Sequence, residues 1–571
     1  MFLKQIPNKK SGRIFLSIVE PYRHKESGNT RTKTVLSLGY LDELEQQMKD
    51  PISFYKQLAR EMTEEKKARQ HTVKLECRIS DTLTRATTDS RNIGFVSLSR
   101  IYHTLGLQSF LSNRQRGLEI EYQLNSVMKM LVYQRILDPG SKKYTYERRN
   151  RYFESYDFTL PDVYRSLSRF AGFRDGLLKH LHRYVTRHYG RDTSTVYYDV
   201  TNYYFEIDQQ DDLHKKGVSK EHRPDPIVQM GLLTDRYGLP VTYKLFSGNT
   251  NDCLTMMPSL SEVRKNYDIG RMIVVADRGL NTGDNIAYNL LKKDGYIFSQ
   301  SVRGANKEFK TYVLDQSDYR VREEGFMFKS RIHPRSIWVT DENDKKVQVT
   351  IDQKQIVYYS EKYARRAKAE RAPALAKARQ LIANPGLYNK TTDYGASKYI
   401  KNLMFDKKTG EILTTGQALQ FDLARLEEEE KWDGYYAIVT SEYRMSDEEV
   451  LKTYRGLWQI EDAFRVSKSD LQTRPVYVSR EDRIEAHFLV CFIALLIVRI
   501  LQLKTNRKFP VAQIIESLSR ANGTLVEDGL YVFCHYDEAL EEIGRTTGVD
   551  YDLKYRTRGD IRSLVGASKK V

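Results

Sequence analysis

The sequence contains very little cysteine. No two cysteines form a CxxC pair, and the four in 571 residues are far apart: Cys77, Cys253, Cys491 and Cys534. This spacing argues against a structural zinc site and against a disulfide scaffold. We therefore expect a reducing, cytoplasmic environment.

Long hydrophobic runs are also missing. The longest, Phe488 to Val498, has eleven residues, whereas a bilayer-spanning helix needs roughly 20. The N-terminus, MFLKQIPNKKSGR, has no apolar stretch long enough for a signal peptide. We expect a core helix at 488–498 and no membrane partner. No GxxxxGK[ST] loop occurs either, so we expect no nucleotide cofactor.

Basic residues are in excess. Lys and Arg number 92 against 75 Asp and Glu, a net charge of +17. Such a surplus favours a polyanionic partner, because neutralising phosphates releases condensed counterions. A basic enzyme that does not bind nucleic acid remains the alternative. For a nucleic-acid partner we expect association with the nucleoid.

The pattern of residues changes several times along the chain. Residues 12–40 alternate as two strands, 92–190 have helical periodicity with many Arg and Tyr residues, and strand-like runs begin near 195. We predict these regions: an N-terminal β-hairpin and helix region (1–75), a helical DNA-binding region (76–190), a core in two parts (191–302 and 432–505), a mostly β insertion domain (303–431) and a C-terminal region (506–571).

The core segments suggest the fold class. TVYYDVTNYYFEI, IVQMGLLTD and LPVTYKLFS are strand-like runs at hairpin spacing, and MIVVADRG and YIFSQSV alternate with helical segments. Three meandering strands followed by alternating helices and strands suit a mixed sheet covered by helices. We predict an α/β protein with a ribonuclease-H-like core.

Two aspartates occupy positions where acids are unusual. Asp199 interrupts an apolar and aromatic run, and Asp277 follows MIVVA. A lone carboxylate buried on a strand costs several kcal/mol unless it is paired or coordinated. Each residue alone could instead be a strand-end turn or a helix cap, and Gly279 makes a turn at Asp277 plausible.

A third acid lies in a predicted helix, SDEEVLKTYRGLWQIEDAFRVSKSDL, that begins with a capping box. Tyr454, Glu461 and Lys468 recur at intervals of seven, which puts them on one helix face, and Arg465 joins that face. A salt bridge between Glu461 and Arg465 is the simpler explanation of this Glu.

The three acids taken together predict a metal site. Three clustered carboxylates would repel one another and hold a proton unless cations neutralise them. Ligands that offer only oxygen favour Mg²⁺ or Mn²⁺ over zinc. Two such ions can activate an attacking hydroxyl and stabilise the leaving oxygen of a phosphodiester.

Several blocks resemble a known family. They include LSLGYLDEL, DPGSKK, GVSKEHRPDPIVQMGLL, FSGNTND, VVADRGL and YRGLWQIEDAFRVSK. The chain resembles bacterial insertion-sequence DDE transposases whose third-acid helix bears a Tyr–Arg–Glu–Lys signature, and within them the insertion sequence 1634 subgroup. The resemblance implies that Asp199, Asp277 and Glu461 bind metal and catalyse, and that Tyr454 and Lys468 are the signature residues.

One signature position departs from the pattern. The Arg expected four residues before Glu461 is Leu457 here. A phosphate contact must then come from elsewhere, with Arg455 or Arg465 as candidates. In the block SKEHRPDPIVQ, Lys220 and Arg223 are further candidates for contacts with the DNA backbone, against the alternative that they are ordinary surface residues.

The intervals between the acids are 78 and 184 residues. The long second interval matches an insertion domain, as in relatives that cleave through a DNA hairpin and hold a flipped base against aromatic side chains. Trp458, one turn before Glu461, could stack on such a base. We favour a role for Trp458 as an anchor in the core.

The resemblance also implies a reaction and partners. Double-stranded transposon ends with terminal inverted repeats are bound, a 3′-OH is freed by hydrolysis, and this hydroxyl attacks target DNA within a synaptic homodimer. Two alternatives stay open: a structure-selective nuclease on the same core without strand transfer, and a non-enzymatic DNA-binding protein descended from a transposase.

Overall fold

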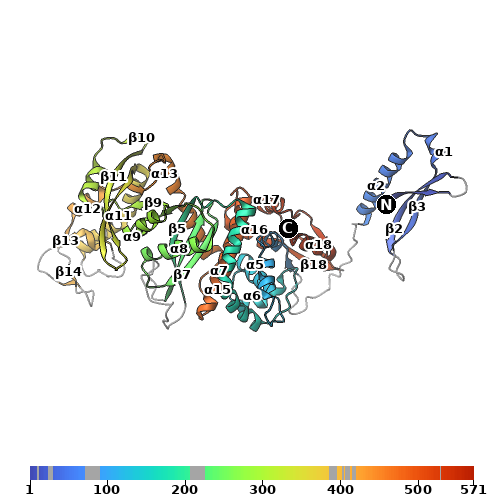
Figure 1. The fold of residues 1–571 in the computed structure, drawn as a ribbon, viewed down its shortest axis with the longest axis horizontal. Coiled ribbons are helices and arrows are strands. Elements are labelled where there is room, and N and C mark those ends of the chain that lie inside the picture. Colours follow the sequence, from blue (N-terminus) through green and yellow to red (C-terminus); the bar gives the residue numbers. More distant parts are fainter. Residues whose placement is uncertain are drawn as a thin grey trace. The chain divides into compact units, whose positions relative to one another are not determined.

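The computed structural model describes residues 1–8, 12–23, 30–70, 90–205, 226–384, 395–401, 404–405, 412–413, 419–527 and 529–570. The chain forms two compact units, 1–87 and 88–571 (Figure 1). Each is described by itself.

The N-terminal unit is a three-stranded antiparallel sheet with two helices. Its elements are β1 (Phe2–Pro7), β2 (Ile14–Arg23), β3 (Thr30–Tyr40), α1 (Leu41–Glu45) and α2 (Pro51–Gln70), with the strands in the order β1-β2-β3. Leu16 and Ile18 of the central strand are fully buried. The two strands predicted over 12–40 are present, and β1 is an additional strand that the sequence pattern did not indicate.

A nine-stranded mixed sheet organises the second unit, in the order β10-β11-β12-β17-β9-β8-β5-β6-β7. The strands are β5 (Thr195–Tyr204), β6 (Ile227–Asp235), β7 (Pro240–Ser247), β8 (Ile273–Ala276), β9 (Gly295–Gln300), β10 (Arg320–Glu323), β11 (Phe326–Thr340), β12 (Lys346–Ser360) and β17 (Tyr435–Thr440). β8 pairs in parallel with β5 and β9, and the other neighbours are antiparallel. The chain is therefore a mixed α/β protein.

Helices cover both faces of β5. Successive side chains of a strand point to opposite faces. The Tyr198 hydroxyl lies 3.1 Å from Ser259 Oγ in α8 (Met256–Asn266), whereas the Tyr197 hydroxyl donates to the Thr453 carbonyl in α13 (Asp447–Arg455) at 3.2 Å. Odd-numbered residues of β5, including Asp199, thus share the face covered by α13.

The predicted core helix is part of α15 (Glu481–Lys504). This helix is long and apolar enough to cross a membrane, but 94% of its apolar window is buried inside the protein. It packs against α3 (Phe95–Thr104), α5 (Leu124–Leu137), α7 (Leu160–Tyr189) and α16 (Val511–Arg520). It is a core helix, as predicted.

The start and the end of the second unit meet in a small sheet of order β20-β19-β18-β4. Its strands are β4 (Ser90–Asn92), β18 (Asn522–Glu527), β19 (Leu530–Phe533) and β20 (Tyr555–Thr557). Helix α18 (Arg558–Ser568) packs on β20, and the same unit also contains α4 (Leu107–Gln115), α6 (Lys142–Glu147) and α17 (Glu538–Thr547). The helical region and the C-terminal region therefore share one body.

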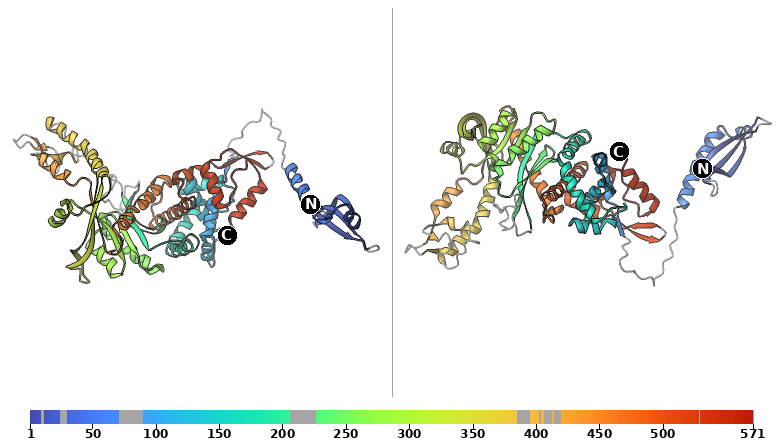
Figure 2. Two further views of the ribbon diagram at one scale, coloured as in Figure 1. Left: turned by 90° about the horizontal axis from the view of Figure 1, so that it is seen from above. Right: turned by 60° about the horizontal axis from the view of Figure 1, so that its bottom comes forward.

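The segment between β9 and β17 extends the main sheet. β11 and β12 form a long hairpin, and β12 pairs directly with β17. The other elements of this segment are α10 (Lys307–Leu314), α11 (Glu361–Ala383), β13 (Ile400–Lys401), β14 (Met404–Phe405), β15 (Ile412–Leu413), β16 (Gln420–Phe421) and α12 (Leu423–Glu430), whereas α9 (Gly283–Leu291) lies between β8 and β9. Helix α11 projects away from the sheet (Figure 2).

Candidate active site

Asp199 and Asp277 lie at the same level of neighbouring strands. The parallel register of β5 and β8 pairs Thr195 with Ile273 and Tyr197 with Val275, an offset of 78 residues. This offset equals the interval between the two aspartates. Asp277 directly follows β8, so continuing the register two residues beyond Tyr197 and Val275 brings it beside Asp199. Neighbouring strands are about 4.8 Å apart.

The carboxylate of Asp277 is held by side chains from other elements. Ser299 on β9 donates its hydroxyl to Asp277 Oδ1 at 2.7 Å, and the Tyr454 hydroxyl donates to the same oxygen at 3.5 Å. Asn281 donates to the Ser299 carbonyl at 2.9 Å, which ties the turn after Asp277 to β9. Ser299 was not predicted as a site residue, since a lone Ser in a strand has no distinguishing pattern.

The predicted helix from Ser446 is interrupted. Its capping box between Ser446 and Glu449 is present, but α13 ends at Arg455, α14 (Trp458–Arg465) begins after a break, and 466–470 is π-helical. At the break, Leu457 N bonds to Tyr454 O, an i→i+3 contact that tightens the turn. A Cβ on Gly456 would lie 2.0 Å from the Tyr197 hydroxyl, so only glycine fits there.

Glu461 lies on α14, which packs on β5 and β6. The side chain is exposed. The pKa of Glu461 is raised. The main cause is the partial removal of its carboxylate from water, and the second is the negative charge of nearby Asp277. The pKa of the Tyr454 hydroxyl is also raised, chiefly by burial, with Asp277 and Glu461 adding to it. Tyr454, Asp277 and Glu461 thus form one electrostatic cluster despite the break.

The segment after Glu461 is anchored by hydrogen bonds. Ser467 and Tyr203 on β5 are joined through their hydroxyls at 3.0 Å, and His487 Nε2 lies 2.9 Å from the Thr473 carbonyl. Lys142 contacts His487 Nδ1 at 2.9 Å. Lys142 belongs to the DPGSKK block, so this block supports the end of the Glu461 segment from inside the protein.

The cationic candidates differ in their surroundings. Arg465 pairs with Asp462 at 2.8 Å and with Asp470 at 3.5 Å, not with Glu461. Arg455 is exposed, with its guanidinium 5.4 Å from the Phe326 ring. Lys468 Nζ lies 5.5 Å from the Tyr203 ring. Leu457 is buried, which explains why an arginine is not accommodated at this position. Lys220 and Arg223 lie outside the described residues.

Trp458 is not the core anchor that we favoured. Its side chain is 54% exposed, because Leu457, Ile460 and Ala463 take the positions that face the core. The aromatic surface stays available to solvent.

An aromatic cavity of about 560 Å³ opens beside Asp277. Tyr358 on β12 and Tyr436 on β17 stack in it, with centroids 5.5 Å apart and planes at 14°, and the ring of Tyr363 on α11 lies 5.0 Å from Tyr436. Arg278 and Tyr454 complete the wall nearest Asp277. The sequence pattern does not predict this cavity, because its residues meet only through the pairing of β12 with β17.

The carboxylates suit a hard cation by their chemistry. They offer only oxygen, and the influence of Asp277 on Glu461 is a repulsion that a divalent cation would relieve. Among the described residues, however, no three His, Cys, Asp or Glu side chains are grouped so that they could hold a metal ion. The three carboxylates are thus chemically suited to such an ion, but they are not already arranged around one common metal position.

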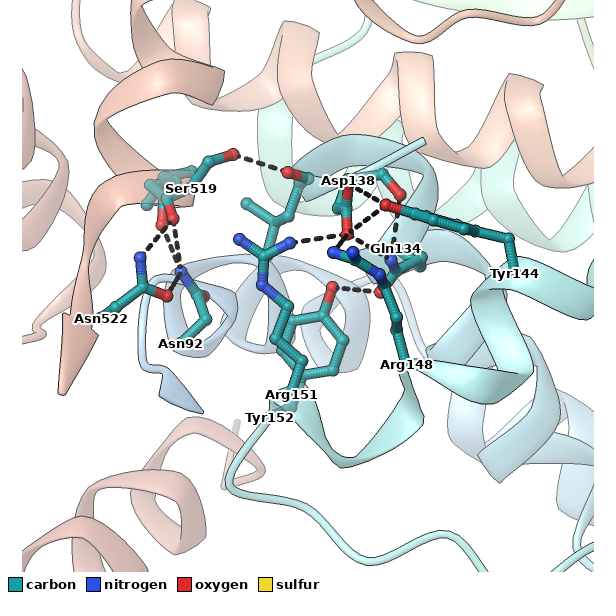
Figure 3. A network of polar contacts seen from close by, with 11 residues as sticks. Asn92, Gln134, Asp138, Tyr144, Arg148, Arg151, Tyr152, Ser519 and Asn522 are labelled. Atoms are coloured by element: carbon teal, nitrogen blue, oxygen red, sulfur yellow. Dashed lines mark hydrogen bonds and ion pairs between the residues drawn. The ribbon is translucent and has the colours of Figure 1, made fainter. Parts of the chain in front are cut away.

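The arginine-rich stretch 144–156 belongs to the helical region predicted to bind DNA, and several of its side chains are engaged internally. Asp138 accepts hydrogen bonds from Arg151 at 2.6 Å, Arg148 at 3.2 Å and the Tyr144 hydroxyl at 3.1 Å (Figure 3). The Tyr152 hydroxyl donates to Gln134 at 2.7 Å. These contacts brace the loop between α5 and α6.

Comparison with known proteins gives two family matches. The family model described as IS1634 family transposase, N-terminal domain, matches residues 3–73, and the one described as Transposase DDE domain matches residues 215–497. The second match includes Asp277 and Glu461 and begins after Asp199. No curated protein matches.

Among solved structures, the chain is similar to a piggyBac transposase synaptic complex with hairpin DNA, studied by cryo-electron microscopy. The identity is 9% and the TM-score 0.33, over 86% of this chain and 79% of that chain. The two family matches identify the chain: it is a DDE transposase of the IS1634 family, and thus a polynucleotidyl transferase and endonuclease.

Proposed function

We propose that the protein catalyses cut-and-paste transposition, cleaving DNA at transposon ends and joining the freed 3′-OH to target DNA. One observation carries this proposal. The parallel register of β5 and β8 places Asp199 beside Asp277, and the charge of Asp277 raises the pKa of Glu461. These three residues are the proposed catalytic and metal-binding acids.

The strand arrangement supports a ribonuclease-H-like core. β5, β6 and β7 form an antiparallel meander, and β8 and β9 add in parallel on the other side of β5. If these five strands are numbered in chain order from β5, their order across the sheet is 3-2-1-4-5, that is, β7, β6, β5, β8 and β9. The segments 191–302 and 432–505 are the proposed two parts of this core, with 303–431 inserted between them.

Asp199, Asp277 and Glu461 would hold two Mg²⁺ or Mn²⁺ ions, since DDE transposases generally use divalent metal ions. When bound, such ions supply stabilisation of the attacking and leaving oxygens of a phosphodiester. Ser299 and Tyr454 donate to Oδ1 of Asp277 and so leave Oδ2 of that carboxylate for a cation. The two hydrogen bonds to Oδ1 therefore fix the orientation of the Asp277 carboxylate before a cation binds.

The reaction is phosphoryl transfer without a covalent protein intermediate. Water attacks the phosphorus at the transposon end, and the bond to the 3′-oxygen breaks to release a 3′-OH. That hydroxyl then attacks a target phosphorus and displaces the target's own 3′-oxygen. The protein contributes positioning and charge.

DNA contacts near the acids come from the exposed cations and Tyr454. Arg455 is the better candidate for the phosphate contact that Leu457 cannot make, because Arg465 already binds two carboxylates. Lys468, Lys220 and Arg223 remain proposed backbone contacts.

We also propose that second-strand cleavage uses a DNA hairpin. A tight hairpin leaves a base unstacked, and an aromatic surface offsets the lost stacking. The cavity beside Asp277, with Tyr436 43% exposed, offers such a surface. Trp458 on α14 is the second candidate, since it too is exposed.

The deciding experiment is strand transfer by the purified full-length protein, with Mg²⁺, on DNA carrying the two ends that flank its own gene. Joined products support transposition, and their assembly with two protein copies would support a synaptic homodimer. Cleavage without joining would instead identify a structure-selective nuclease. Binding without metal-dependent chemistry would identify a non-enzymatic DNA-binding protein.

The acids are tested individually by Asp199→Asn, Asp277→Asn and Glu461→Gln. Each should abolish cleavage while sparing end binding. Glu448→Gln is the matched control, because Glu448 is an exposed acid on the neighbouring helix α13. Normal cleavage by any of the three variants would remove that residue from the site.

A further inference from the structure

Three arginines line a groove between α4 and α7, away from the acids. The groove has a volume of about 510 Å³, and its arginines are Arg114 on α4 with Arg183 and Arg187 on α7. We propose that this groove binds the phosphodiester backbone of duplex DNA. The proposal rests on the proposed function and names a second DNA-binding surface for it.

The groove is built by helical spacing and by one glycine. His180, Arg183, Tyr184 and Arg187 recur every three or four residues, so they share one face of α7. Gly106, before α4, has φ +64°, and a Cβ there would lie 2.6 Å from the Tyr184 ring. Only glycine allows the chain to turn so close to α7, and this approach brings Arg114 opposite Arg183 and Arg187.

In the part of the chain that the structure describes, the three arginines have no acidic partner. Among the described residues no ion pair involves Arg114, Arg183 or Arg187, and no carboxylate lines the groove. Two other arginines of α7 are paired: Arg165 with Asp162 at 3.0 Å, and Arg174 with Glu262 at 2.8 Å. Three like charges facing one cavity repel one another, and a polyanion would remove that repulsion.

The floor of the groove favours phosphate over base. Phe110 and His180 have ring centroids 5.1 Å apart, His180 stacks on Tyr184 at 4.3 Å, and Tyr184 stacks on His188 at 5.7 Å. The ring faces of Tyr184 are therefore occupied from both sides and are not free for a nucleobase. Burial, together with the charge of Arg183, lowers the pKa of His180, so the positive charge comes from the arginines.

Arginine suits this ligand. The planar guanidinium binds phosphate oxygens through two parallel hydrogen bonds. Asn113 of α4 adds a neutral donor at the same rim. Arg148 and Arg151, by contrast, are held by Asp138 (Figure 3), so the α4–α7 groove is an available basic surface of the helical region and the 148–151 loop is not.

The connection to the core gives the groove a role. α7 ends at Tyr189 and β5, which carries Asp199, begins at Thr195. A DNA backbone held by Arg183 and Arg187 is thus bound by the element that leads directly into the catalytic strand. Such contacts set position and register without reading sequence.

The test is the salt dependence of DNA binding by the full-length protein carrying Arg114→Ala, Arg183→Ala and Arg187→Ala together. The probe is a mixed-sequence DNA duplex with no divalent metal. Each lost phosphate contact makes the negative slope of log K against log salt shallower by about 0.9. The slope of the triple variant should therefore be shallower than that of the wild type by about 2.7. A variant with lysine at all three positions should keep most of the slope.

The control triple is Arg165→Ala, Arg520→Ala and Arg545→Ala, which removes the same charge from exposed arginines that have acidic partners. It should keep the wild-type slope. Equal slopes for the groove triple and the wild type would overturn the proposal, as would equal losses in both triples. Equal thermal unfolding midpoints show that all variants are folded.

Failure of the groove and failure of the function give different results. If the wild type cleaves and joins its own ends while the groove triple binds with an unchanged slope, the groove proposal is wrong and transposition stands. If the wild type shows no chemistry on its ends but the groove triple loses its slope, the groove proposal stands and the proposed reaction is wrong.

Discussion

Ser299 donates its hydroxyl to Oδ1 of Asp277 at 2.7 Å. Because Ser299 comes from β9 and Asp277 follows β8, this bond orients the second acid of the site through the parallel pairing of two strands. We call Ser299 a positioning residue.

Ser299→Ala should slow cleavage by about 10- to 100-fold, the usual cost of removing a residue that orients a metal ligand. The reason is that Asp277 loses its shorter hydrogen bond and keeps only that from Tyr454. Single-turnover cleavage measured over a range of Mg²⁺ concentrations checks this, and the variant should need more Mg²⁺ for half-maximal rate. Ser336→Ala, at an exposed serine of β11, is the control. An unchanged Mg²⁺ requirement would show that Ser299 does not position Asp277.

Glu461→Gln should stabilise the metal-free protein at neutral pH. Partial loss of hydration and Asp277 raise the pKa of Glu461 in the folded state, so the folded protein binds more protons than the unfolded chain between the two pKa values. Stability then falls as the pH rises through that interval. The gain from the variant should therefore appear above the ordinary Glu pKa of about 4.3 and vanish below it.

The same variant should respond less to Mg²⁺. A ligand present at 100 times its Kd stabilises the folded state by about 2.7 kcal/mol, and Glu461→Gln weakens that binding. Thermal unfolding with and without Mg²⁺, over a range of pH, measures both effects. Glu448→Gln should behave as the wild type. A variant less stable than the wild type without metal would contradict the electrostatic account of Glu461.

Tyr436→Ala should reduce hairpin formation more than Trp458→Ala does. Tyr436 stacks with Tyr358 in the cavity beside Asp277, whereas Trp458 lies on α14 in a separate small pocket with Tyr237 and Arg507. Base–aromatic stacking is worth about 1–3 kcal/mol, which corresponds to a loss of roughly 5- to 150-fold. Hairpin yield on pre-nicked ends is the measurement. A loss confined to Trp458→Ala would move the base site to α14.

Lys142→Met should stabilise the protein most at low pH. Burial, with the charge of Arg135, lowers the pKa of Lys142 to about 7. Between about 7 and the ordinary value the unfolded chain binds more protons, so wild-type stability rises with pH over this range. The advantage of the variant should shrink by a few kcal/mol from pH 7 to 10. Denaturant unfolding at several pH values measures this, and a pH-independent difference would show that burial does not lower the pKa of Lys142 in the fold.

Much of the site could be predicted from the sequence. Local features of the sequence include the two acids at strand positions, the capping box at Ser446 and ligands that offer only oxygen. The interval of 78 residues between the two aspartates equals the offset between paired residues of β5 and β8. The core helix at 488–498 was also predictable, because eleven successive apolar residues must be buried somewhere.

Other features were decided by contacts between residues far apart in the chain. The break at Gly456 depends on the Tyr197 hydroxyl, which occupies the space of a side chain, and no helical periodicity contains that information. Trp458 is exposed because its neighbours fill the core face, and the aromatic cavity exists because β12 pairs with β17.

The arginines show the same division. Sequence alone determined that the protein is basic, which favours a partner that carries phosphate, since net charge is a sum over residues. Only the tertiary structure decided which arginines are available: Arg148 and Arg151 are bound by Asp138, whereas Arg183 and Arg187 face a groove without acids. Charge pairing depends on distances in space, and these follow from packing rather than from sequence order.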